Sequence, residues 1–223
     1  KSTILPFLKK HDQYVRDNIF SLISYSFKDM SCFFCKEFLK YEGIDINYVN
    51  ENNNSGEAYL TSAVYENNSN AIEYLLNNFP DIDVNTLKVH WCSPLYLASG
   101  IFTDIKIIKL LCSHPNTNIN YSIKKYKLPV YKMALMKGNV IASEFFFNNY
   151  KHILNEGEIK QLIFYCLQKH HLLSTKLFLR FIFESKFNLE KNQIVNDLAN
   201  YLLDNQQNSD NIFNDFSLIL SEL

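Results

Sequence analysis

The chain has 223 residues, a hydrophobic fraction of 47% and a formal net charge of −1. This hydrophobic content excludes an intrinsically disordered chain, and the near-neutral charge excludes a global field that would recruit nucleic acid or acidic lipid. No apolar run approaches the roughly 18 residues of a spanning helix, and the first ten residues lack the layout of a signal peptide. The five cysteines are odd in number and lie mostly in apolar stretches, so we expect a reducing compartment and a cytoplasmic protein.

The first half of the chain is predicted to form short helices in pairs. Residues 1–17 are interpreted as a cap or as the remnant of an earlier repeat, and since the first residue is Lys1, we expect a longer or processed polypeptide. The apolar periodicity then predicts a helix pair over 18–27 and 30–40. Three further first helices are predicted to start 35 residues apart, at Ala58, Ser93 and Leu128.

The first helices share features that suit close packing. Ser93 followed by Pro94 is a good helix start, because the hydroxyl caps free amides and the ring pre-sets the first turn. The copy at Ala58 has neither feature, and we expect no side-chain cap there. Small residues allow neighbouring first helices to approach closely, at Ala63, Ala98 and Ala134.

The C-terminal part is predicted to continue as less regular helix pairs. Residues 158–223 are interpreted as degenerate repeats and a C-terminal cap, with helices over 158–170, 172–185, 192–203 and 211–223. Together with the repeats over 18–157, this gives an all-α fold of five to six helix pairs. Because a pair of such short helices cannot bury its apolar stripe alone, we expect each pair to stack on its neighbours.

The repeat is also marked by a short phrase in the loop that follows each pair. The phrases end at Asn47, Asn85 and Asn120, and 35 residues separate Asn85 from Asn120. A further 35 residues lead to Asn155, where the register ends. A fixed period of this length is typical of stacked repeat proteins.

The amino-acid sequence of the most regular repeat resembles the ankyrin repeat. Residues 93–98 read S-P-L-Y-L-A, residues 107–111 read I-I-K-L-L and residues 118–120 read N-I-N, which are similar to the family phrases T-P-L-H-x-A, I-V-K-L-L and D-V-N. The resemblance is most specific over 57–120 and is similar to divergent ankyrin arrays of protists. It implies an ankyrin-type solenoid whose function is protein–protein interaction.

The chain departs from the family in two respects. Its repeat is 35 residues rather than the family's usual 33, and Trp91 and Tyr126 stand where the family has a glycine before the helix start. A glycine there permits positive φ, which an aromatic residue resists. We therefore expect the hairpin loops between helix pairs, called fingers here, to be reshaped in these repeats.

We predict that the protein is not an enzyme and needs no cofactor or metal. The chain has no glycine-rich phosphate loop, no G-x-S-x-G and no H-E-x-x-H. Cys32 and Cys35 have metal-site or redox spacing, but one such pair supplies two of the four ligands of structural zinc, so we interpret them as two buried thiols. His170 and His171 point to different helix faces, and His114 precedes a loop proline, so none is predicted as a ligand.

The resemblance implies that a protein partner contacts the fingers and the outward residues of the first helices. Trp91, the only tryptophan, is either the best single anchor or a residue that packs between fingers. The predicted finger contacts are Thr86, Lys88, His90, Trp91, Tyr121, Lys124, Lys125 and Tyr126. The predicted groove contacts are Ser62, Tyr65, Leu97, Gly100 and Lys132.

Two other functions stay open at the level of sequence. The chain could be a structural component of a large cytoskeletal or other assembly, with binding spread over many surfaces. The stretch 121–137 interleaves five lysines with tyrosines, which is typical of nucleic-acid binding, although it contains no arginine. A solvated face or an acidic protein partner explains that stretch better in a chain of near-zero net charge. No small-molecule substrate and no membrane insertion are predicted.

Overall fold

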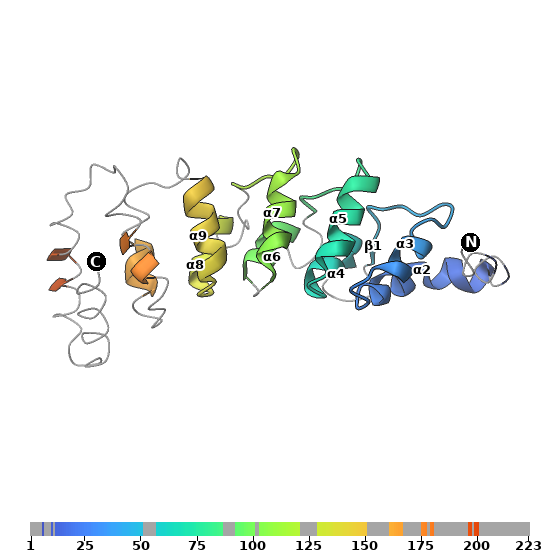
Figure 1. Ribbon diagram of the computed structural model, residues 1–223, viewed down its shortest axis with the longest axis horizontal. Helices are drawn as coiled ribbons and strands as arrows, with labels where there is room; N and C mark the ends of the chain where they lie inside the picture. Colours follow the sequence, from blue (N-terminus) through green and yellow to red (C-terminus); the bar gives the residue numbers. More distant parts are fainter. Residues whose placement is uncertain are drawn as a thin grey trace. The chain divides into compact units, whose positions relative to one another are not determined.

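The computed structural model describes most of the chain up to residue 166, together with single helical positions near both ends. The described ranges are 12–50, 57–86, 92–100, 103–120, 129–150 and 161–166. This part of the protein is mostly helical (Figure 1), which confirms the predicted all-α class. The chain forms two compact units, Lys1–Val130 and Tyr131–Leu223. Within the described ranges, no helix combines the length and apolar character that a membrane crossing requires.

The described part of the first unit contains three helix pairs. Their bounds are α2 (Asp12–Ser26) with α3 (Phe33–Phe38), α4 (Tyr59–Tyr65) with α5 (Ser69–Asn78), and α6 (Pro94–Gly100) with α7 (Ile105–Ser113). Each first helix packs against the next first helix, α2 on α4 and α4 on α6, while α5 packs on both α3 and α7. Figure 1 shows these pairs side by side in chain order.

The bounds of the first pair differ from the prediction. Helix α2 begins at Asp12 rather than at residue 18, because its buried face extends back to Val15. Helix α3 begins at Phe33 rather than at residue 30. The Asp29 carboxylate accepts hydrogen bonds from the backbone N–H groups of Ser31 and Phe33, at 3.0 and 3.1 Å, and this loop delays the helix start.

The core of the first unit lies between the paired helices. The small residues Ala63 and Ala98 are fully buried, as expected for first helices that approach closely. The second helices turn their apolar faces inward, through Ile72 and Leu75 in α5 and Ile107 in α7. Burial of these aliphatic side chains, at roughly 1.5–3 kcal/mol each, supplies most of the stabilisation.

The starts of α4 and α6 differ in how they are capped. The Ser93 hydroxyl accepts a hydrogen bond from the Tyr96 N–H at 3.2 Å, which confirms the predicted cap of α6. At the start of α4, the Thr61 hydroxyl donates to the Ala58 carbonyl at 2.8 Å and accepts from the Ala58 N–H at 3.1 Å. The start of α4 therefore has no side-chain cap at Ala58, as predicted, and Thr61, three residues later, holds the Ala58 backbone instead.

The turns inside two pairs share one geometry. Asn67 and Gly138 adopt positive φ angles of 53° and 71°, and each is followed by an asparagine that caps the second helix. The side-chain oxygens of Asn68 and Asn139 accept from the backbone N–H three residues later, at 2.9 and 3.1 Å. Asparagine and glycine are the residues that enter the left-handed region most easily.

A short hairpin precedes α4. Strands β1 (Val49–Asn50) and β2 (Glu57–Ala58) are antiparallel, with Val49 opposite Ala58 and Asn50 opposite Glu57. This pair lies where a finger is expected before the second repeat. It brings Asn50 and Glu57 close to the start of α4.

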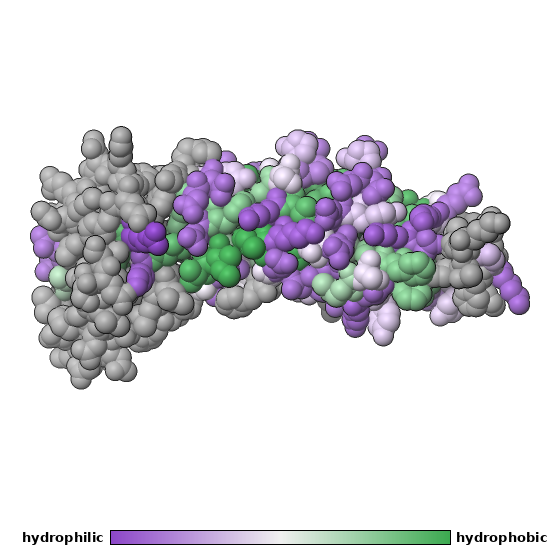
Figure 2. All heavy atoms as spheres, viewed as in Figure 1, coloured by the Kyte–Doolittle hydropathy of each residue, from purple (hydrophilic) through white to green (hydrophobic). Residues whose placement is uncertain are grey.

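The second unit contains most of α8 (Val130–Met136), α9 (Val140–Asn149) and a further helical stretch over 161–166. Tyr131 and Ala134 are buried, as predicted for positions that pack. Helix α9 is apolar on more than one face, since Phe146 is buried while Ile141 is 64% exposed. Figure 2 shows hydrophobic residues reaching the surface where α8 and α9 lie.

The later predicted helices are described only in part. Helical positions at 161–166, at 175–177 and 179–180, and at 196–197 and 199–200 fall inside the three predicted ranges 158–170, 172–185 and 192–203. The predicted helix over 211–223 lies outside the described residues.

Candidate partner-binding groove

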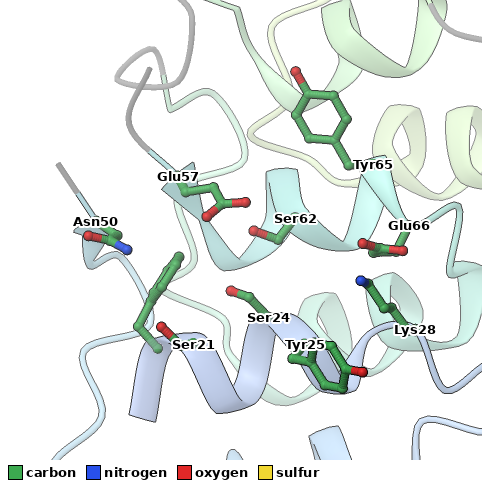
Figure 3. A pocket seen from close by; sticks show the side chains of 10 residues that line it. Ser21, Ser24, Tyr25, Lys28, Asn50, Glu57, Ser62, Tyr65 and Glu66 are labelled. Atoms are coloured by element: carbon green, nitrogen blue, oxygen red, sulfur yellow. The ribbon is translucent and has the colours of Figure 1, made fainter. Parts of the chain in front are cut away.

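A groove of about 340 Å³ opens between the first helices α2 and α4 (Figure 3). We call it the α2–α4 groove. From α2 and the turn after it, the lining residues are Phe20, Ser21, Ser24, Tyr25 and Lys28. From the hairpin, α4 and its C-terminal end, they are Asn50, Glu57, Ser62, Tyr65 and Glu66.

Two serine hydroxyls lie in the groove without a hydrogen-bond partner. Ser24 Oγ and Ser62 Oγ are both inaccessible and unpaired, and the Ser62 residue is only 4% exposed. Figure 3 shows both hydroxyl groups directed into the space between the two helices. A buried hydroxyl without a partner costs about 1–3 kcal/mol, so these two groups lower the stability of the contact between α2 and α4.

Aromatic side chains form the walls of the groove. Tyr25 is 72% exposed and Tyr65 is 47% exposed, so both rings offer surface to a ligand. Phe20 is buried at the other end, where its ring centroid lies 4.8 Å from that of Tyr59 and 5.6 Å from that of Tyr48. These contacts fix Phe20 in place as a rigid apolar surface.

The charged groups of the groove are unevenly distributed. Glu66 lies beside Lys28 at one end, whereas Glu57 stands at the other end near Asn50 (Figure 3). Neither glutamate forms an ion pair within the described part of the chain. The Lys28 ammonium instead lies 4.8 Å from the centroid of the Tyr25 ring, a cation–π distance. Both glutamates of the groove therefore carry a negative charge that no ion pair neutralises.

The surroundings of Tyr65 raise the pKa of its hydroxyl group. Partial burial raises the pKa of Tyr65, and the neighbouring Cys92 and Glu57 raise it further. Tyr65 therefore stays neutral at physiological pH and can donate a hydrogen bond.

Two of the predicted groove residues, Ser62 and Tyr65, line the α2–α4 groove. Leu97 and Gly100 lie half-buried in α6, and Lys132 lies half-buried in α8, but none of the three lines this groove. Thr86 is buried and offers little surface to a partner. The remaining predicted contacts lie outside the described residues: Lys88, His90, Trp91, Tyr121, Lys124, Lys125 and Tyr126.

Sequence reasoning missed the groove residues contributed by α2 and by the hairpin. Ser21, Tyr25 and Lys28 follow one another at helical spacing, and this stripe of mostly exposed residues could have indicated a surface face. Ser24 and Glu57 gave no such signal, because their role depends on which elements pack together.

The cysteines do not form a metal site. Cys32 and Cys35 are joined by a disulfide with a Cα–Cα distance of 5.2 Å, so the interpretation as two separate thiols was wrong. The left-handed backbone at Cys32 brings the two sulfurs together across the start of α3. Burial raises the pKa of Cys166 to about 12 and also raises that of Cys92. Among the described residues, no group of three or more His, Cys, Asp or Glu side chains could hold a metal ion.

No protein-family model matches the chain, and no curated protein is significantly similar to it. The functional proposal therefore rests on the groove and on the contacts that recur between helix pairs.

Proposed function

We propose that this protein is a non-catalytic scaffold or adaptor of the ankyrin-like repeat type, which binds a protein partner along the face formed by its first helices. The observation that carries the proposal is the α2–α4 groove, which lies between the first helices of two successive pairs. Two of its lining residues, Ser62 and Tyr65, are positions at which the family resemblance implies partner contact.

Several contacts support a stacked-repeat arrangement for the first unit. The Asn68 amide donates to the carbonyls of Phe27 and Asp29 at 2.8 and 2.9 Å, and so connects the second pair to the turn of the first. The Asn67 side chain accepts from the Asp104 N–H at 2.8 Å, and so connects the second pair to the third. Equivalent turns thus contact their neighbours in sequence, as expected for stacked repeats.

The chemistry of the groove favours a protein partner over a small metabolite. The groove is open, and its exposed walls are tyrosines, which are enriched among the residues that dominate protein–protein binding energies. Its lining includes the Glu57 carboxylate, which can accept hydrogen bonds from the backbone amides of a polypeptide segment. Neither wall offers the enclosed apolar cavity typical of small-molecule sites.

The proposal is tested by affinity purification of the full chain from its native cell, followed by binding of the recovered protein to variants. Tyr65→Ala should reduce retention of the partner about tenfold or more, whereas Tyr14→Ala should leave it unchanged. Tyr14 is a matched control, because it is 64% exposed on α2 but does not line the groove. Equal retention by both variants would reject the groove as the binding site.

A second candidate is a structural component of a large assembly, in which contacts are distributed over many surfaces. It is favoured by large apolar side chains exposed away from the groove, namely Met30, Phe33 and Phe34 in the first unit and Ile141 in the second. Retention of the protein in a salt-resistant particle would support this candidate. A freely soluble pool would support the adaptor.

A further inference from the structure

The loop before α3 holds a cysteine in a backbone conformation that cysteine disfavours. Cys32 has a φ angle of 53° and a ψ angle of 26°, in the left-handed region, and its side chain makes no capping hydrogen bond. Residues with a Cβ atom enter this region at a cost in free energy, which asparagine and glycine tolerate best. The other positive φ angles among the described residues occur at such types, Gly43, Asn67 and Gly138. At Cys32 the unfavourable backbone coincides with the disulfide to Cys35.

The surrounding residues favour a longer helix. The apolar periodicity predicts a helix from residue 30, whereas α3 begins at Phe33. Asp29 is already placed to cap such a helix, because its carboxylate accepts from the Ser31 N–H at 3.0 Å. The Lys36 N–H donates to the Cys32 carbonyl at 3.2 Å, with the spacing of a helical hydrogen bond. Cys32 is therefore the residue at which a left-handed backbone interrupts the helix.

We propose that the Cys32–Cys35 disulfide is a redox-sensitive switch that sets where α3 begins. In the oxidised chain, the cross-link holds Cys32 in the left-handed region and α3 starts at Phe33. In the reduced chain, Cys32 enters the right-handed region and the helix extends back to Met30. This switch is independent of partner binding in the α2–α4 groove.

The extension rearranges an exposed apolar surface. Met30, Phe33 and Phe34 are large apolar side chains that are exposed in the oxidised chain. In a continuous helix, residues with the spacing i, i+3 and i+4 share one face, so these three side chains form a single stripe. The left-handed residue between Met30 and the two phenylalanines breaks this spacing in the oxidised chain. The redox state thus changes the apolar surface that the first unit presents.

The reductant of this switch is a dithiol. One of its thiolates attacks a sulfur of the Cys32–Cys35 pair, which breaks the S–S bond and forms a mixed disulfide. The second thiol of the reductant, as its thiolate, then attacks the reductant's own sulfur in the mixed disulfide, closes a disulfide within the reductant and releases the second cysteine. The protein gains two electrons and two protons, and the dithiol loses them.

Access to the sulfurs requires the loop to open, because both cysteine side chains are fully buried. The Asp29 carboxylate holds the loop by exposed hydrogen bonds from the N–H groups of Ser31 and Phe33. Elements held by exposed bonds open locally without global unfolding. We expect slow reduction of the folded chain, and Asp29→Ala should speed it at least about fivefold. Equal rates would contradict this opening route.

The experiment is NMR of the isotopically labelled full chain, before and after treatment with dithiothreitol. On reduction, the Cα chemical shifts of residues 30–32 should move to helical values. Amide exchange of Cys35 should slow about fivefold, since its N–H gains the helical hydrogen bond to the Ser31 carbonyl. Cys32→Ala and Cys35→Ala should show the helical shifts with or without dithiothreitol. The control Cys112→Ser, which removes a cysteine outside the disulfide, should respond like the wild type.

The comparison of oxidised with reduced wild type decides the matter even where a variant fails to fold. Unchanged shifts at residues 30–32, once all five cysteines react with a thiol reagent after reduction, would overturn the switch. Global unfolding on reduction would also overturn it, because the disulfide would then be a structural cross-link. Helical shifts at residues 30–32 in the oxidised chain would show that the helix start does not depend on the disulfide.

Discussion

Asn85 repeats the hydrogen bonding of Asn47. The Asn47 amide donates to the Asp81 carbonyl at 2.8 Å, and its oxygen accepts from the Asp83 N–H at 2.7 Å. In the next loop, Asn85 makes the same two bonds, at 2.6 and 2.8 Å, to the carbonyl of Asn116 and the N–H of Asn118. The last residue of the first and second repeated phrases therefore connects one loop to the next.

We predict that Asn85→Ala and Asn47→Ala each lower the free energy of unfolding by about 1–2 kcal/mol, because each removes two hydrogen bonds between loops. The bonds are exposed, so water partly replaces them. Asn77→Ala is the control, since Asn77 is exposed on α5 and should change stability by no more than about 0.5 kcal/mol. Chemical denaturation measures all three, and equal effects at the three positions would contradict a special role for the loop asparagines.

Asn68 should matter more than either loop asparagine. Its side chain is fully buried, caps α5 and donates two hydrogen bonds to the turn of the preceding pair. Asn68→Ala leaves these buried groups unsatisfied and should destabilise the protein by about 3 kcal/mol. The control is Asn70→Ala, which removes one exposed bond to the Met30 carbonyl and should cost under about 1 kcal/mol.

The disulfide between Cys32 and Cys35 predicts a definite thiol count. Three cysteines, Cys92, Cys112 and Cys166, are not joined in a disulfide. Unfolded protein without reductant should therefore react with three equivalents of a thiol reagent, and reduced protein with five. Five equivalents before reduction would show that Cys32 and Cys35 are not joined.

A thiol reagent should also react at different rates with the three cysteines that form no disulfide in the folded protein. Since burial raises the pKa of Cys166 to about 12, its thiolate is scarce at pH 8, and the side chain is shielded from reagent. We expect Cys112 to be alkylated first and Cys166 to stay unmodified until the protein unfolds. Mass spectrometry of peptides after brief alkylation measures the order, and early modification of Cys166 would contradict its burial.

Tyr59 should make stability fall at alkaline pH. Burial raises its pKa well above the usual value of 10.0, with smaller contributions from Tyr48 and Asp45. Above pH 10 the unfolded chain loses this proton while the folded chain keeps it, so the free energy of unfolding falls as pH rises. Tyr59→Phe should make this fall shallower, by up to about 1.4 kcal/mol per pH unit. Urea unfolding between pH 9 and pH 11 measures the slopes, and identical slopes would show that Tyr59 titrates normally.

The helical class and the packing positions could be predicted from sequence because they depend on local periodicity. Ala63 and Ala98 recur at one register, and Ser93 begins its helix where capping chemistry indicates. The contact of Thr61 with the Ala58 backbone was not predicted, because Thr61 lies three residues inside the helix. The early start of α2 was missed because the repeat register does not extend that far.

Only some of the residues that line the groove could be predicted from the sequence. Ser62 and Tyr65 belong to a repeat whose family resemblance implies an outward position. Ser24 lies on α2 and Glu57 lies in the hairpin. These two residues come to line the groove only because α2 packs against α4. Such tertiary neighbourhoods are not encoded in the spacing of residues along the chain.

The most direct test of partner binding in the α2–α4 groove is site-specific photo-cross-linking. The photoreactive amino acid p-benzoylphenylalanine replaces Tyr65 in one form of the full chain and Tyr14 in another, and each form is irradiated with the partner recovered by affinity purification. Binding in the groove predicts a covalent product from position 65 and none from position 14. A product from position 14 in the absence of one from position 65 would contradict it.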